Sequence, residues 1–149
     1  MKRFQILFLL CLALSFTFSI FAQDTKEVII LQTSDVHSRI EPINQKGDLY
    51  YNKGGFVRRA AFLEEFRKDH KNVLLFDCGD ISQGTPYYNM FRGEVEIKLM
   101  NEMGYDAMTI GNHEFDFDVD NMARIFKMAD FPVVCANYNL DATVLKDIV

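Results

Sequence analysis

Side chains that can bind metal ions are concentrated at three places in this sequence. Asp35 and His37 are two residues apart, where extended backbone would point both side chains the same way. Asp80 follows a glycine that permits a sharp bend, and Asn112 and His113 begin a third polar group. Carboxylate, amide and imidazole ligands together suit zinc, manganese or iron. These residue types therefore suggest a shared cation site.

Each of these groups also has a simpler interpretation. Ser34-Asp35 is common turn chemistry, Asp80 could cap a turn or helix, and a lone histidine in a polar loop usually faces solvent. Asp77 is assigned a structural role, in which its carboxylate accepts backbone hydrogen bonds. His70 lies in a wholly polar segment and is interpreted as part of a solvated helix end.

The third group contains a histidine with a nearby carboxylate. Asp116 is three residues after His113 and could accept a hydrogen bond from one nitrogen of its ring. Such a bond fixes the tautomer and favours the protonated ring. A histidine oriented in this way is a common proton donor or charge stabiliser. We therefore expect a catalytic role for this pair.

The segments between these groups alternate between strand and helix patterns. Continuous apolar runs predict buried strands at residues 28–31, 73–76, 107–110 and 133–136. Apolar residues at helical spacing predict helices over about 56–66, 94–103 and 119–129. The inward face of the first helix is expected to hold Phe56, Val57, Ala60, Ala61, Leu63 and Phe66. Pro86 is interpreted as marking a loop.

The alternating order predicts an α/β fold with a mainly parallel sheet and helices on its faces. The three polar groups follow the first three predicted strands, and Asn137 follows the fourth. Open α/β sheets bind ligands beyond the carboxyl ends of their strands. We therefore expect these side chains to meet at one edge of the sheet.

Residues 1–22 have the pattern of a secretory signal peptide. A short basic start precedes an almost wholly apolar run from Phe4 to Phe21, and the small residue Ala22 precedes polar residues. This predicts export to the periplasm or the extracellular space. An uncleaved membrane anchor is the alternative, because the run approaches the length of about 20 residues that spans a bilayer. A lipid anchor on Cys11 is less favoured, because Cys11 lies inside the run.

The remaining residues, 23–149, are acidic. Removing Lys2 and Arg3 from the 16 basic residues leaves 14 against 21 acidic residues, a net charge of −7. That balance argues against binding to a nucleic-acid polymer and suits a protein that collects divalent cations. Cys78 and Cys135 are interpreted as small buried thiols, with a disulfide between them as the alternative.

Taken in order, the polar groups resemble the first three motifs of the calcineurin-like metallophosphoesterases. These are Asp-Val-His at 35–37, Gly-Asp at 79–80 and Gly-Asn-His-Glu at 111–114. The 5′-nucleotidase branch is the closer match, through residues 31–38, 54–56, 79–86 and 111–116. The resemblance extends from about residue 28 to 139.

The resemblance implies an αββα metallophosphatase domain that binds two divalent metal ions. By matching position, Asp35 and His37 would bind the first metal, Asp80 would bridge both, and Asn112 would bind the second. These ligands do not distinguish zinc, manganese, iron, cobalt, magnesium and calcium. His113 would contact the phosphate and be oriented by hydrogen bonding to Asp116.

The activity implied is hydrolysis of the phosphate esters of nucleotides by a two-metal, water-attack mechanism, with a nucleotide as the small-molecule substrate. The alternatives are a related enzyme that acts on cyclic nucleotides or another ester, and a metal-binding fragment without turnover. The family adds further histidines and a nucleoside-binding domain later in the chain. We therefore expect residues 23–149 to form the N-terminal, incomplete part of the domain, with only part of the catalytic site.

Overall fold

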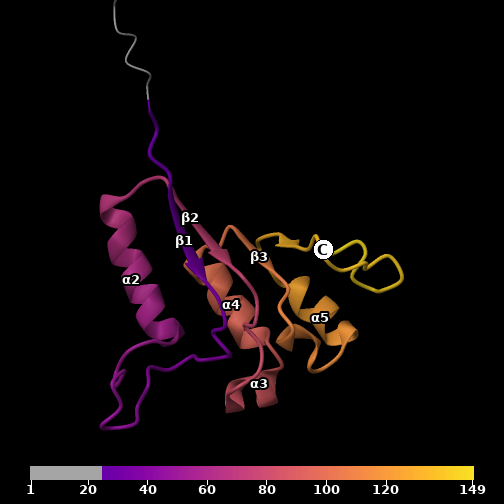
Figure 1. Ribbon diagram of the computed structural model, residues 1–149, viewed down its shortest axis with the longest axis horizontal. Helices are drawn as coiled ribbons and strands as arrows, with labels where there is room; N and C mark the ends of the chain where they lie inside the picture. The colour runs from indigo at the N-terminus through magenta and orange to yellow at the C-terminus, as the bar shows by residue number, and fades with distance from the viewer. Residues whose placement is uncertain (1–24) are drawn as a thin grey trace, which may run out of the picture.

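The computed structural model describes residues 25–149, so the predicted signal peptide at 1–22 lies outside the described residues. Four parallel strands form one sheet in the order β1-β2-β3-β4, with flanking helices (Figure 1). The strands are β1 Ile29–Thr33, β2 Val73–Asp77, β3 Ala107–Thr109 and β4 Val133–Val134. The helices are α2 Gly55–Asp69, α3 Pro86–Phe91, α4 Glu94–Met103, the short 3-10 helix η1 His113–Phe115 and α5 Val119–Phe126.

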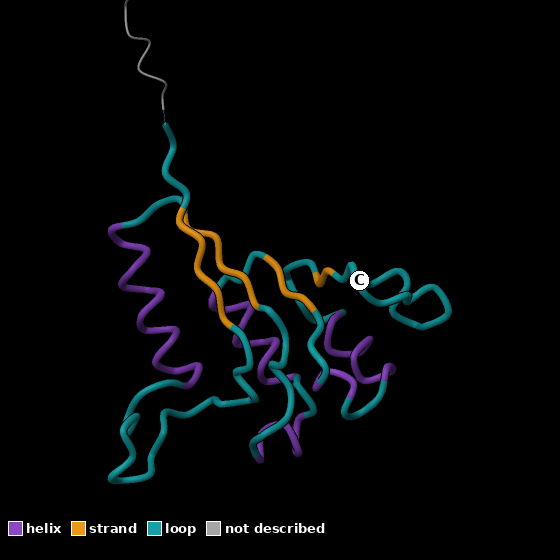
Figure 2. The backbone as a smooth tube through the Cα atoms, viewed as in Figure 1, coloured by secondary structure: helices purple, strands orange, loops and turns teal. Residues whose placement is uncertain are grey.

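The predicted strands and their parallel arrangement are confirmed. Each strand pairs with the next one along the chain, with Ile29 opposite Val73 at the start of the sheet and Met108 opposite Val133 near its end. The fourth strand is shorter than predicted and contains only two residues. All four strands run the same way, so the loops that follow β1, β2 and β3 leave from one edge of the sheet (Figure 2).

The predicted helices are present with small differences in their bounds. α4 spans 94–103 as predicted and ends at Gly104, whose left-handed backbone closes the helix. α5 ends at Phe126, before the predicted limit at residue 129. The interpretation of Pro86 as a loop marker was wrong, because Pro86 is the first residue of α3. Proline suits that position, since a first-turn N–H has no partner within the helix.

The helices cover only one face of the sheet within residues 25–149. Leu75 and Met108 point into the core and are each 1% exposed, whereas Ile30 is 65% and Val134 51% exposed. Buried residues from α2, α4 and α5 form one cluster with the inward strand residues. Connections between neighbouring parallel strands are almost always right-handed, and in a sheet with this strand order that hand places successive helices on the same side. The predicted flanking helices are therefore present, and within residues 25–149 they lie on one face of the sheet.

The predicted apolar face of α2 is only partly buried. Phe56 and Leu63 are in the core, but Val57, Ala60 and Ala61 are exposed. α2 lies beside the edge strand β1 (Figure 1), so a narrow stripe of the helix meets the core.

No helix within residues 25–149 is long and apolar enough to cross a membrane.

Cys78 and Cys135 are both free thiols, as favoured over a disulfide. Cys78 is nevertheless exposed and Cys135 only partly buried, so the prediction that both are buried was wrong.

Candidate metal centre at the carboxyl edge of the sheet

Three polar side chains converge where the strands end. His37, Asp80 and His113 each offer a ligand atom, and these atoms lie within 4.8 Å of one another. The imidazole rings of His37 and His113 meet edge to face with their centres 5.0 Å apart. The three residues follow β1, β2 and β3, respectively. Two imidazoles and a carboxylate at this separation fit a transition-metal ion, which takes nitrogen and oxygen ligands together.

The loop after β1 presents His37 through unusual backbone geometry. Asp35, His37 and Ser38 have positive φ angles of 53°, 45° and 53°. Non-glycine residues rarely adopt this left-handed conformation, which persists only where surrounding contacts hold it. Here the backbone N–H groups of the three residues donate to carbonyl oxygens of residues 79–81, at 3.0, 3.0 and 2.8 Å. The two loops are therefore fastened together along their backbones.

Asp80 lies at the centre of the site, where the backbones of Gly79 and Gly111 approach each other closely. Its φ angle is 57°, and its carboxylate accepts a hydrogen bond from the backbone N–H of His113 at 2.9 Å. A Cβ atom on Gly79 would overlap the backbone of Gly111, and a Cβ on Gly111 would overlap the Asp80 carboxylate. Glycine at both positions lets the loops after β2 and β3 approach closely enough to bring Asp80 beside His113.

Glu114 holds this arrangement together, a role that was not predicted from the sequence. Its side chain is 1% exposed. The carboxylate accepts backbone hydrogen bonds from residues 80, 81 and 82 at 3.0, 3.0 and 3.1 Å, and from Gly111 at 2.6 Å. Four N–H donors supply the hydrogen bonds that a buried carboxylate needs in place of water. Its place directly after Asn-His was visible in the sequence, but three of its four partners are more than 30 residues away.

Asp77 has the structural role expected of it. Its carboxylate accepts hydrogen bonds from the backbone N–H of Gly79 at 2.8 Å and from the Thr33 hydroxyl at 2.5 Å. These bonds join the ends of β1 and β2 to the turn that carries Asp80. Burial raises the pKa of Asp77 to about 6, although both hydrogen bonds and the charge of Arg59 act to lower it.

His113 and Asp116 form the predicted pair. Nδ1 of His113 is 2.7 Å from Oδ2 of Asp116. This hydrogen bond is the main reason that the pKa of His113 is raised above its ordinary value, because the carboxylate stabilises the protonated ring. Since Nδ1 is engaged with Asp116, Nε2 is the nitrogen left to face the site.

Other predicted site residues follow the same strands. The Asp35 carboxylate is in contact with the Ser34 hydroxyl and is outside the group formed by His37, Asp80 and His113. Asn112 is exposed and immediately precedes η1. After β4, Oδ1 of Asn137 accepts a hydrogen bond from the Cys135 thiol at 3.4 Å. Metal binding by Asp35 and Asn112 therefore stays a prediction.

His70 lies at the other end of β2, as expected for a residue outside the site. It follows the last residue of α2 and precedes β2. Its ring is partly buried and stacks on Phe66 with centres 4.2 Å apart, so it is not fully solvated as predicted.

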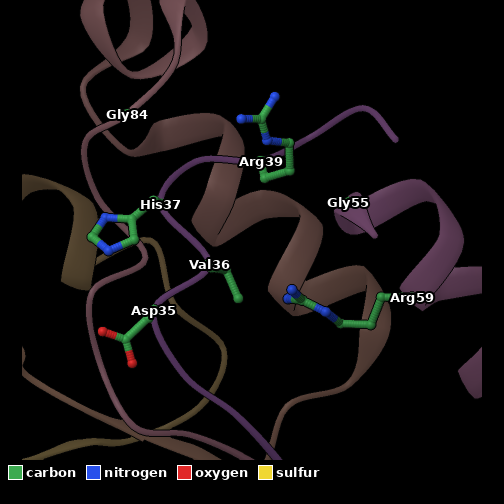
Figure 3. A pocket seen from close by; sticks show the side chains of 7 residues that line it. All are labelled: Asp35, Val36, His37, Arg39, Gly55, Arg59 and Gly84. Carbon is green, nitrogen blue, oxygen red and sulfur yellow. The ribbon is translucent and has the colours of Figure 1, made fainter. Parts of the chain in front are cut away.

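A cavity of about 480 Å³ adjoins the loop at 35–37, lined also by Arg39, Gly55, Arg59 and Gly84 (Figure 3). Asp35 and His37 project from one side of the loop, and Val36 projects from the other side toward Arg59 (Figure 3). Arg59 donates to the Tyr105 hydroxyl at 3.0 Å and lies over the Phe56 ring at 4.6 Å. The arginines place positive charge beside the candidate metal centre.

Comparison with known proteins identifies a family that this sequence matches. The sequence profile described as "Calcineurin-like phosphoesterase" matches residues 28–146. A snake venom 5′-nucleotidase from Gloydius brevicauda is 40% identical over 129 residues, which are 82% of this chain and 21% of that protein. The 5′-nucleotidase of Homo sapiens is 39% identical over 116 residues, or 74% of this chain and 20% of that protein.

A solved structure shows the same fold. The 5′-nucleotidase precursor from Thermus thermophilus superposes with a TM-score of 0.72 at 35% identity, covering 81% of this chain and 24% of that chain. The four-stranded parallel sheet with its flanking helices thus matches the N-terminal part of a metallophosphatase fold. The chain spans only about a fifth of the length of the curated relatives it matches.

Proposed function

We propose that this chain, which belongs to the calcineurin-like phosphoesterase family, contributes the metal-binding half of a site that hydrolyses phosphate esters of nucleotides. The observation that carries the proposal is that His37 and Asp80, two of the proposed metal ligands, offer ligand atoms within 4.8 Å of a ring nitrogen of His113 at the carboxyl edge of the sheet. Similarity to several 5′-nucleotidases supports a nucleotide as the substrate.

Two divalent metal ions are proposed as cofactors, and when bound they would neutralise phosphate charge and activate water for attack. Asp35 and His37 would hold the first ion, Asp80 would bridge the two, and Asn112 would hold the second. The carboxylate, imidazole and amide groups of these residues are suitable donors for such ions. The close contact of Asp80 with the loops after β1 and β3 supports its central position.

His113 is proposed to act on the phosphate. Asp116 fixes its Nδ1 at 2.7 Å and raises its pKa, so the ring can present a protonated Nε2 toward the substrate. A positive group at that position would stabilise the negative charge that develops on the phosphate oxygens.

Several parts of the proposal extend beyond residues 25–149. The chain covers about a fifth of the relatives, so the activity and substrate of a whole protein are proposed by similarity alone. Export through the segment at 1–22 to the periplasm or the extracellular space is likewise a proposal.

The experiment that tests the function measures metal binding and phosphate release together. The full chain is titrated with Mn²⁺ or Zn²⁺, and phosphate release from a nucleoside 5′-monophosphate is followed before and after chelation. We expect binding of the metal, and any hydrolysis should disappear with the chelator. A chain that binds metal but releases no phosphate would identify a metal-binding fragment without turnover.

A pair of histidine variants controls for general effects of substitution. His37→Ala removes a proposed ligand and should weaken metal binding sharply. His70→Ala removes a histidine at the opposite end of β2 and should leave metal binding unchanged. Equal losses in the two variants would contradict the assignment of the site.

A further inference from the structure

A second buried glutamate, Glu96, lies beneath the loop that carries His37. Glu96 is in the first turn of α4 and is 0% exposed. Its Oε1 contacts the Ser38 hydroxyl, and its Oε2 has no hydrogen-bond partner. Among residues 25–149, none of the ion pairs includes Glu96. A charged carboxylate is almost never buried in this way without a cation or several donors.

The neighbouring hydroxyl groups limit where protons can be. Thr85 Oγ1 is 2.9 Å from the backbone carbonyl oxygen of Ser38, which can only accept, so the Thr85 hydroxyl donates there. Ser38 Oγ is 2.7 Å from Thr85 Oγ1, and that contact then uses the Ser38 proton. If each of the three contacts is one hydrogen bond, the bond between Ser38 and Glu96 needs a third proton. Glu96 is the only member of the cluster that can supply it.

Opposing effects act on the charge of this carboxyl group. The N-terminal end of α4 favours a carboxylate, but that effect is modest and fades within the first turn. A hydrogen bond from the backbone N–H of Glu96 itself also favours the carboxylate. Burial favours the neutral acid and raises the pKa of Glu96. Because the group is fully buried and one oxygen is unpaired, the cost of desolvating a charge is the larger effect.

We infer that Glu96 is a neutral carboxylic acid that positions His37 by holding Ser38, the next residue in the loop, through a buried hydrogen bond. Ser38 has left-handed backbone with a φ angle of 53°, and its side chain is fixed by Glu96 and Thr85. Contacts of this kind are needed to keep a non-glycine residue in that conformation. The inference rests on the proposed role of His37 as a metal ligand.

The test compares two substitutions of Glu96 in the full chain, with Mn²⁺ or Zn²⁺ alone as the probe. E96Q keeps a neutral group whose amide can donate to Ser38, so metal affinity should stay close to that of the wild type. E96A removes the donor and should weaken metal binding by about 10- to 100-fold, as is typical when support for a ligand is lost. Equal weakening of metal binding by E96Q and E96A would overturn the inference that Glu96 is a neutral acid, because it would show that the negative charge is required.

A matched control is available on the same helix. Glu94 is two residues earlier in α4, and its side chain is paired with Lys98 and Arg124 near the surface. E94Q and E94A should both leave metal affinity unchanged. Unaltered metal affinity in E96A would overturn the positioning role of Glu96.

An infrared measurement tests the protonation state without any metal. Wild-type protein and E94Q should show a carbonyl band of a protonated carboxyl group at neutral pH that is missing in E96Q. The absence of any difference between wild type and E96Q in that region would overturn the inference.

A second variant covers the case in which E96A does not fold. Thr85→Val is nearly isosteric and removes one hydroxyl from the cluster, so it should weaken metal binding in the same direction as E96A. Unchanged metal affinity in Thr85→Val would overturn the role of the Ser38, Thr85 and Glu96 cluster in positioning His37. Because metal affinity is measured without substrate, a chain that binds metal but lacks phosphatase activity would refute only the proposed function.

Discussion

The two ends of the parallel sheet contain the same polar residue types in different settings. At the carboxyl end, Asp80 and His37 have left-handed backbone and converge with His113. At the amino end, Asp106 precedes β3 and accepts a hydrogen bond from the backbone N–H of Leu75 at 2.7 Å. The Asp80 carboxylate also accepts a backbone hydrogen bond, from His113, but in addition it lies within 4.8 Å of ligand atoms of two histidines.

The histidines of the two ends also differ in their surroundings. His70, at the amino end, stacks on Phe66, whereas His113 is bonded to Asp116. Asn72 donates to the backbone carbonyl of Glu27 at 3.0 Å, also at the amino end. Residue type alone therefore does not identify a metal site. The distinguishing feature of the carboxyl end is that ligand atoms from the segments after three different strands converge within 4.8 Å.

The strongest test of this contrast exchanges one carboxylate for an amide at each end. Asp80→Asn should lower metal binding and activity by more than about 100-fold, beyond the loss typical of residues that only support ligands. Asn keeps a side-chain oxygen that can accept the hydrogen bond from the backbone N–H of His113, so the loss of metal binding would reflect the missing charge. Asp106→Asn should leave metal binding intact and cost about 1 kcal/mol of unfolding free energy. Similar metal titrations for the two variants would remove the proposed distinction between the ends.

The next largest effect is expected where the carboxyl end depends on Glu114. Glu114→Gln replaces one acceptor oxygen with a donor that faces backbone N–H groups. Loss of these charge-assisted hydrogen bonds should lower the free energy of unfolding by about 2–3 kcal/mol. Chemical denaturation measures this, with Glu94→Gln on the surface as the matched control. A Glu114→Gln variant as stable as the Glu94→Gln variant would show that Glu114 does not hold the loops.

A smaller effect is expected from the partner of His113. Asp116→Asn removes the negative charge that raises the pKa of His113, so that pKa should fall and less of the ring should be protonated at neutral pH. Turnover should fall by about tenfold if the protonated ring stabilises the phosphate. NMR titration of the His113 ring in metal-free protein follows the pKa directly. An unchanged His113 titration would argue against the orienting role of Asp116.

The smallest effect is expected at the amino end. Asn72→Ala removes the hydrogen bond to Glu27 at an exposed position, so the free energy of unfolding should change by about 0.5 kcal/mol. Metal affinity should be unaffected. A marked loss of metal binding would show that metal binding at the carboxyl end depends on the amino end of the sheet, and the contrast between the two ends would fail.

Much of the fold and the general location of the site could be predicted from the sequence. The apolar runs at 28–31 and 73–76 and the helical spacing at 94–103 predicted β1, β2 and α4, because periodicity is a local property of the chain. The order of strands and helices predicted a parallel sheet, and such a sheet brings the ends of its strands together. The closeness of the loops that carry His37, Asp80 and His113 follows from those two facts.

Other features were decided only by tertiary structure. The short helix α3 and the exposure of Val57 depend on how neighbouring segments pack, and the uncovered sheet face depends on the handedness of the crossovers. The roles of Glu114 and Glu96 depend on partners that lie more than 30 residues away, at 80–82 and at Ser38. A glutamate in the sequence does not show whether folding will bring its carboxyl group to four backbone N–H donors, as for Glu114, or to one serine hydroxyl, as for Glu96. That difference in surroundings is decided by segments distant in the sequence, which only folding brings together.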